Sequence, residues 1–235
     1  MPKIYALLFA LGIVTACKKS DNPQPTTSPT LNTTTTITDN AGNTYSVGYE
    51  QVSSNNKDPF VLKKDANGNQ LWKYNHESTS VDGTAYLVIL DNNAQPWVVF
   101  SVDGGSNDAD YISKKWVETN AFSNVFMNSY GNGGGPKVAV LAQLDANTGK
   151  ILKGTFLTAR KDDGKTNTFT IKSIGTNNGN IAFEAETTAW PFSTGSSYAK
   201  IPNITDADRI DGVFKVYYEI KNDLSEIVVA TLKKP

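Results

Sequence analysis

Short runs of β-branched and aromatic residues recur along the chain from residue 33 to the C-terminus, and clusters of Asn, Gly and Asp separate them. The first four runs are TTTTITD, TYSVGYE, PFVLKKD and NQLWKYN, with the turns NAGN and ANG between the members of each pair. β-Branched and aromatic residues favour strands, whereas Asn, Gly and Asp favour tight turns. The pattern therefore predicts hairpins of antiparallel strands rather than helices.

The same arrangement occurs twice more. The second group reads TAYLVILD, PWVVFSV, KVAVLAQLD and KILKGTFLTA, and the third reads TFTIKSIG, NIAFEAETTAW, VFKVYYEIK and EIVVATLKK. In each group the first and last links are tight and the middle link varies, as in a meander of two hairpins. We therefore predict an all-β domain of three consecutive four-stranded antiparallel meanders, at about residues 37–80, 81–160 and 166–233. The last turn of the third group, NDLS, lacks glycine, so its register is the least well specified.

Two phrases of the first group, DNAGNTYSVG at residues 39–48 and FVLKKDANGNQLW at residues 60–72, resemble the repeat of bacterial β-propellers. The resemblance implies a propeller-like fold and carries no catalytic residues. Propellers usually have four to eight blades, so three groups imply an incomplete propeller or one closed by dimerisation. An ordinary β-sandwich is the alternative.

The N-terminal sequence predicts where in the cell the protein is located. Residues 1–16, MPKIYALLFALGIVTA, carry one cation, Lys3, and then an apolar run too short to cross the bilayer core of about 30 Å as a helix. This is typical of a signal peptide. The segment ends in Val14-Thr15-Ala16-Cys17, which resembles the lipobox of bacterial lipoproteins.

The lipobox resemblance implies that Cys17, the only cysteine, is lipidated and attaches the protein to a membrane. A plain secretory signal is the alternative. Lys18 stands where an inner-membrane lipoprotein commonly has Asp, which implies the outer membrane, on its periplasmic or cell-surface face. Residues 18–36 are rich in Pro, Ser, Thr and Asn, so they predict a disordered tether before a single domain at 37–235.

The composition indicates one class of partner that is not expected. The formal net charge is −1 and charged residues make up 19% of the chain, so no basic surface is implied. Nucleic acid is therefore not an expected partner.

The middle links of the second and third groups, residues 103–137 and 191–211, are long and mix aromatic residues with Asp and Asn. Aromatic faces beside polar side chains suit sugar rings or peptide segments. The candidate ligand-binding residues in or beside these loops are Tyr111, Trp116, Tyr130, Trp190 and Tyr198. Alternatively the rings form satellite cores that hold the loops in place. Trp116 and Phe126 are the candidates to cover the open end of a monomer, which we expect in preference to a homodimer.

The chain offers little for metal binding or catalysis. NDAD at 107–110 and TDADRID at 205–211 could supply oxygen ligands to calcium, but they lack the EF-hand spacing and are also ordinary turn sequences. His76 is the only histidine, and no G-x-S-x-G motif accompanies it. Glu184 and Glu186 share one face of a strand, either as a solvated face or as a carboxylate pair.

We therefore predict no catalytic residue, no metal and no cofactor. The expected function is a lipid-anchored, non-enzymatic binding module for a glycan, peptide or protein, which uses loops 103–137 and 191–211. The alternative is a lipid-anchored polysaccharide hydrolase.

Overall fold

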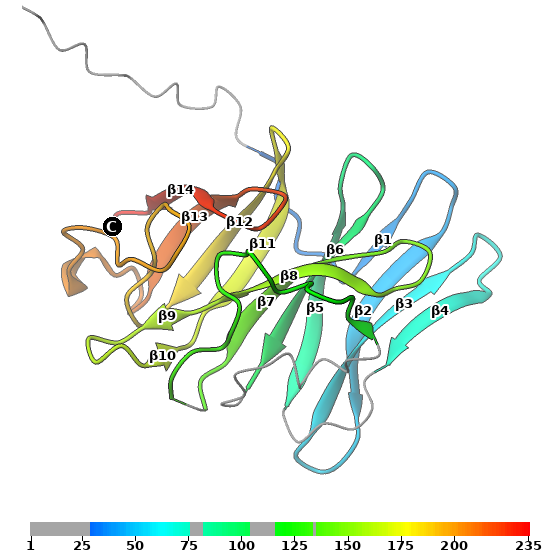
Figure 1. Ribbon diagram of the computed structural model, residues 1–235, viewed down its shortest axis with the longest axis horizontal. Coiled ribbons are helices and arrows are strands. Elements are labelled where there is room, and N and C mark those ends of the chain that lie inside the picture. Colours follow the sequence, from blue (N-terminus) through cyan, green and yellow to red (C-terminus); the bar gives the residue numbers. More distant parts are fainter. Residues whose placement is uncertain (1–28, 76–81, 104–115, 134) are drawn as a thin grey trace, which may run out of the picture.

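The computed structural model describes residues 29–75, 82–103, 116–133 and 135–235. Across these ranges the protein is all-β, with three four-stranded antiparallel sheets and one two-stranded sheet (Figure 1). None of the helical turns in this part of the chain is long and apolar enough to span a membrane. Cys17, His76, the NDAD segment and Tyr111 lie outside the described residues.

The three large sheets confirm the predicted meanders, because each one uses its four strands in chain order. The first sheet contains β1 (Thr36–Thr38), β2 (Thr44–Gln51), β3 (Lys57–Lys64) and β4 (Gln70–Asn75). The second contains β5 (Gly83–Leu90), β6 (Pro96–Val102), β7 (Val138–Leu144) and β8 (Ile151–Leu157). The third contains β11 (Thr170–Asn177), β12 (Asn180–Thr187), β13 (Phe214–Ile220) and β14 (Ile227–Leu232).

Two small elements were not predicted. A hairpin of β9 (Ala159–Arg160) and β10 (Thr166–Asn167) connects the second sheet to the third, and a 3-10 turn, η3 (Asp206–Asp208), interrupts the link between β12 and β13. Both lie beside the pocket described below.

The repeated turn sequence has a local physical cause. The carboxylate of Asp39 accepts hydrogen bonds of 2.9 Å from the backbone N–H groups of Ala41 and Asn43, and Gly42 has a positive φ of 83°. Asp thus satisfies the turn's exposed donors, and Gly takes the left-handed conformation at little cost. Carboxylates accept backbone N–H groups in the same way in the turns that begin at Asp65, Asp91 and Asp145.

The second sheet lies between the other two (Figure 1), since β5 contacts β2 and β3 on one side and β11 on the other. Six of the seven residues of β6 and six of the seven residues of β7 are buried. Burial on both faces removes the usual alternation of apolar and polar residues. This explains why PWVVFSV and VAVLAQL are nearly continuous apolar runs.

The outward face of the third sheet is polar, and that of the first sheet mixes polar and apolar side chains. On the third sheet, Glu184 pairs with Lys233 at 2.5 Å and Glu186 pairs with Lys172 at 3.5 Å. Both glutamates therefore belong to a partly exposed, ion-paired face, the solvated-face interpretation of this motif. On the first sheet, hydroxyl pairs join β1 to β2, and Lys73 pairs with Glu50. Leu71, which is 52% exposed, also lies on the first sheet, so polar side chains cover the third sheet more fully than the first.

The long link between β6 and β7 contributes to the core. The described part of this link runs alongside β8. The N–H of Gly154, in β8, donates to the carbonyl of Ala121 at 3.0 Å. Phe126 is 4% exposed, and its ring centroid lies 4.9 Å from that of Phe192. The ring of Trp116 lies 5.5 Å from that of Tyr74. These aromatic residues therefore hold the loop against the sheets, and they join the main core rather than a separate one.

The predicted tether, residues 18–36, extends too far along the chain, because residues 32–35 already bond to the domain. Asn32 exchanges two backbone hydrogen bonds with Ile174 of β11, at 2.7 and 2.9 Å. The carbonyl of Thr34 accepts the N–H of Val88 in β5, and that of Thr35 accepts the N–H of Val47 in β2. Residues 32–35 thus connect all three large sheets and belong to the domain. These residues have polar side chains and make their contacts through the backbone. No apolar pattern in the sequence therefore marked them as part of the domain.

Candidate functional site

A pocket of about 330 Å³ opens between the β9–β10 hairpin and the link from β12 to β13. Its lining is polar and charged apart from one indole ring and one alanine. The lining residues are Lys161, Asp162, Asn167, Thr188, Ala189, Trp190, Asp206 and Arg209.

The β9–β10 turn fixes one wall of the pocket. The N–H of Lys161 donates to the carbonyl of Lys165 at 2.9 Å, and Gly164 supplies a φ of 78° between them. The hairpin is joined to the opposite wall by two backbone hydrogen bonds between Arg160 and Trp190, at 3.2 and 3.0 Å. The turn residues are therefore held at a defined position relative to the indole.

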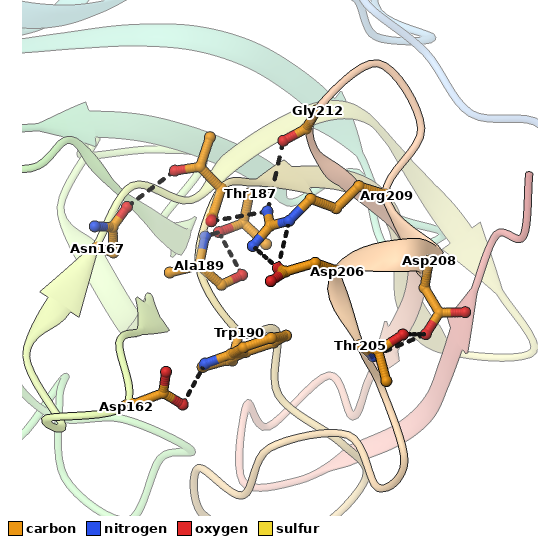
Figure 2. Close-up of polar contacts among 11 residues, drawn as sticks. Asp162, Asn167, Thr187, Ala189, Trp190, Thr205, Asp206, Asp208, Arg209 and Gly212 are labelled. Atoms are coloured by element: carbon orange, nitrogen blue, oxygen red, sulfur yellow. Dashed lines mark hydrogen bonds and ion pairs between the residues drawn. The ribbon is translucent and has the colours of Figure 1, made fainter.

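Trp190 is half-buried, and its ring is oriented by its neighbours. The indole N–H donates a hydrogen bond of 2.6 Å to Asp162, as Figure 2 shows. The ammonium of Lys200 lies 3.2 Å from the ring centroid and covers one face, and the ring of Phe214 lies 5.4 Å away.

Arg209 fixes the other wall. Its Nε and Nη2 atoms both lie 2.9 Å from Oδ1 of Asp206, and its Nη1 atom donates to the carbonyl of Thr188 at 2.9 Å (Figure 2). The guanidinium carbon also lies 4.0 Å from the ring centroid of Phe214, which is buried. A planar guanidinium that makes several hydrogen bonds is pre-organised, and this one holds Asp206 in place.

Asn167 adds a hydrogen-bond donor. Its amide oxygen accepts the N–H of Thr168 at 2.8 Å and the hydroxyl of Thr188 at 3.2 Å. These contacts orient the amide and leave its NH₂ group to bond elsewhere. The pocket thus combines carboxylate acceptors, amide and cationic donors, and one aromatic ring.

Two of the predicted ligand-binding residues come together here. Trp190 lines the pocket, and the hydroxyl of Tyr198 donates to the carbonyl of Trp190 at 2.9 Å. The guanidinium carbon of Arg160 lies 4.4 Å from the Tyr198 ring centroid. Burial raises the pKa of Tyr198 to about 12. Tyr198 therefore supports the backbone behind Trp190 rather than lining the pocket itself.

The other predicted residues lie elsewhere. Tyr130 is 1% exposed, and its hydroxyl donates to the carbonyl of Pro136 at 2.5 Å. Burial raises the pKa of Tyr130 to about 12. Trp116 packs beside Tyr74, and Tyr111 lies outside the described residues. Neither Tyr130 nor Trp116 lines the pocket.

The TDADRID segment forms ion pairs. Asp206 pairs with Arg209, Asp208 pairs with Lys234, and Asp211 pairs with Lys215 at 3.0 Å. The hydrogen bond from Lys234 lowers the pKa of Asp208 below its ordinary value. Within the described ranges, no three His, Cys, Asp or Glu side chains gather as a metal site would require. The carboxylates of this segment therefore serve the local structure.

Sequence reasoning missed Lys161, Asp162, Asn167 and Arg209. A signal for the hairpin was present, because DDGK at 162–165 is a turn sequence between LTAR and TNTFT. Nothing in the sequence placed this turn beside Trp190, since that contact depends on the path of the chain between the second and third sheets.

No family model matches this chain, and no curated protein matches it. Among solved structures, it is similar to the GH43_1 enzyme from Xanthomonas citri, determined in complex with xylose. The TM-score is 0.32 at 11% sequence identity, over 85% of this chain and 66% of that chain. A likeness at this level carries no conclusion about activity.

Proposed function

We propose that the protein is a cell-envelope binding module that holds a carbohydrate in the pocket beside Trp190. The observation that carries this proposal is the fixed indole, whose N–H is bonded to Asp162 and whose ring lines a pocket rich in polar side chains. Carbohydrate ligands present apolar ring faces and hydroxyl groups together, and aromatic rings beside directed polar groups match that combination.

The hydrogen-bonding groups in the pocket support a sugar over an apolar peptide. A sugar hydroxyl both donates and accepts. Asp162 and Asp206 offer acceptor oxygens, and Asn167 and Lys161 offer donors. Lys200 covers one face of the indole, so the sugar would contact the part of the ring that Lys200 leaves open. Asp206 and Arg209 lie beside the ring (Figure 2).

Binding of the full-length chain to an array of immobilised polysaccharides tests the proposal. Trp190→Ala should weaken binding by about tenfold or more, as is usual when a central aromatic contact is removed. Tyr49→Ala is the matched control, because Tyr49 is 48% exposed on the first sheet. The proposal is rejected if no polysaccharide binds, or if the folded Trp190→Ala variant binds like the wild type.

A polysaccharide hydrolase is the second candidate, because Asp162 and Asp206 both line the pocket and glycoside hydrolysis uses two carboxyl groups. Each carboxylate already has a local partner, the Trp190 N–H or Arg209, which favours binding over catalysis. Chromogenic glycosides decide between the two. Turnover that is abolished by Asp162→Asn or Asp206→Asn would establish the hydrolase.

The proposed location rests on the lipobox sequence that ends at Cys17. Lipidation there, with residues 18–29 as a tether, would hold the domain at the outer membrane. Cells that express the wild type should incorporate a palmitate analogue into the protein, and cells that express Cys17→Ser should not. Labelling of the serine variant, or none of the wild type, would refute the anchor.

The arrangement of the sheets supports an incomplete, propeller-like monomer. The first strands approach one another, since β5 contacts both β1 and β11. The outward face of the third sheet carries ion pairs, which need no further sheet to cover them. On this proposal Phe126 and Trp116 replace the missing blades as cover for the core.

A further inference from the structure

The charges around the pocket do not balance. Arg209 and Asp206 neutralise each other at 2.9 Å. Asp163, which neighbours the pocket, pairs with Lys165 at 3.0 Å. Asp208 and Asp211 pair with lysines outside the pocket lining. Four nearby carboxylates are therefore already compensated by cations of their own.

Three cations beside the pocket have no ion-pair partner in the described part of the chain. Lys161 lines the pocket and is exposed, Lys200 stacks on Trp190, and Arg160 stacks on Tyr198. Aromatic faces attract cations but do not neutralise them. Hydrogen bonds from Lys165 lower the pKa of Asp163, and Lys161 also attracts this carboxylate and contributes to the lowered pKa. The carboxylate of Asp162 is held by the indole N–H. The charged residues of the lining itself balance, with Lys161 and Arg209 against Asp162 and Asp206, so the excess of positive charge comes from Lys200 and Arg160 beside the pocket.

We infer that the pocket selects an acidic sugar, one that bears a carboxylate or a sulfate ester. This inference rests on the proposed function. A negative group beside Lys161 and Lys200 would compensate the excess positive charge beside the pocket, which a neutral sugar would not do. Complementary charge in a recess raises the association rate and excludes uncharged competitors.

The positions of the two lysines assign them different parts in recognition. Lys161 belongs to the β9–β10 turn, which the Arg160–Trp190 backbone bonds hold against the indole. Lys200 covers one face of the ring and does not line the pocket, so it would act on an acidic group through its charge rather than by direct contact. Lys161 should bind the acidic group directly, and Lys200 should strengthen the field around the ring.

The experiment compares acidic and neutral polysaccharides on the full-length chain. Polygalacturonate is measured against neutral galactan, and sulfated carrageenan against neutral agarose. At least one acidic polymer should bind about tenfold more tightly than its neutral counterpart, and this preference should fall between about 50 mM and about 500 mM NaCl. Lys161→Gln and Lys200→Gln should each reduce the preference. Lys64→Gln, a change of an exposed lysine on β3, is the matched control.

The results separate the inference from the proposed function. Preference for polygalacturonate identifies a carboxylate, and preference for carrageenan identifies a sulfate. Equal binding of neutral and acidic polymers that requires Trp190 but not Lys161 overturns the inference and leaves the proposed function standing. Failure of all four polymers to bind, together with an empty polysaccharide array, rejects both.

Discussion

A β-carbon placed on Gly175 would lie 2.3 Å from the carbonyl oxygen of Thr30. The N-terminal segment and the third sheet therefore pack backbone against backbone, at a separation that no side chain on residue 175 permits. Two hydrogen bonds between Asn32 and Ile174 hold this contact one residue away along β11. The segment is thus a specific part of the fold, and a glycine makes its approach possible.

Gly175→Ala should lower the free energy of unfolding by about 1–3 kcal/mol, because the added methyl group forces the segment away from β11. Urea denaturation measures the loss. A chain that begins at residue 36 provides the control. There the clash is absent, and alanine should stabilise by about 0.5–1 kcal/mol, since glycine is unfavourable inside a strand. An equal loss in both chains would show that Thr30 is not the cause.

Ala94→Gly should raise stability by about 0.5–1 kcal/mol. Ala94 has a φ of 58° at the position where the turn after Asp65 has Gly68, with a φ of 86°. Left-handed backbone costs an L-residue about 1 kcal/mol, and glycine avoids this cost. The reverse change, Gly68→Ala, meets no atom within 4 Å, so its cost should be conformational alone. Thermal and urea denaturation should therefore shift in opposite directions for the two variants. A shift in the same direction would contradict the shared turn geometry.

The turn chemistry is the reason that so much of the fold could be predicted. Asp, Gly and Asn at fixed spacing act within five residues, so turns such as Asp39–Asn43 are written in local sequence. The order of strands in three meanders followed from these turns. Residues 32–35 could not be placed in the same way, because backbone contacts leave no pattern of apolar side chains.

In the last turn of the third meander, burial of a side chain outweighs the usual preference for glycine at a left-handed position. Leu224 occupies a left-handed position with a φ of 63°, yet its side chain is fully buried. Its carbonyl accepts the N–H of Phe126 at 2.7 Å. Burial of a leucine contributes about 1.5–3 kcal/mol, which exceeds the backbone strain. The missing glycine is therefore explained by a contact with a loop about a hundred residues earlier, which local sequence does not reveal.

The pocket could be predicted only in part for a similar reason. Trp190 was a candidate from its aromatic character, but Asp162 and Arg209 approach it from separate links. Their roles depend on how the β9–β10 hairpin and the 188–213 link meet. Tyr130, by contrast, is an aromatic loop residue that the fold buries.

Phe126→Ala should lower stability by about 3–5 kcal/mol, the usual cost of truncating a large buried aromatic residue. Its ring centroid lies 4.9 Å from that of Phe192 and so joins the long loop to the link between β12 and β13. Leu71→Ala, at a position that is 52% exposed, should change stability little. Sedimentation equilibrium of the wild type should give a monomer. A stable dimer that tolerates Phe126→Ala would instead indicate that a second chain covers the core.

The repeated turns should also make stability depend on acid pH. The side-chain amide of Asn69, with the backbone N–H groups of Asn69 and Asn67, lowers the pKa of Asp65 below its ordinary value. A carboxyl group whose pKa is lower in the folded state stabilises the fold above its unfolded pKa, near 4 for Asp. That contribution falls as the pH drops from about 4 through the folded pKa, because the unfolded chain takes up the proton first.

Asp65→Ala should therefore be less stable than the wild type at pH 7, and the difference should narrow below about pH 4. Urea denaturation from neutral pH to about pH 2.5 measures both curves. Asp65→Asn separates charge from hydrogen bonding, because its amide oxygen still accepts the N–H groups but does not titrate. It should retain part of the stability at pH 7 and lose less of it in acid. If the gap between wild type and Asp65→Ala stays constant across the whole range, the carboxylate charge does not contribute, and the turn depends on shape alone.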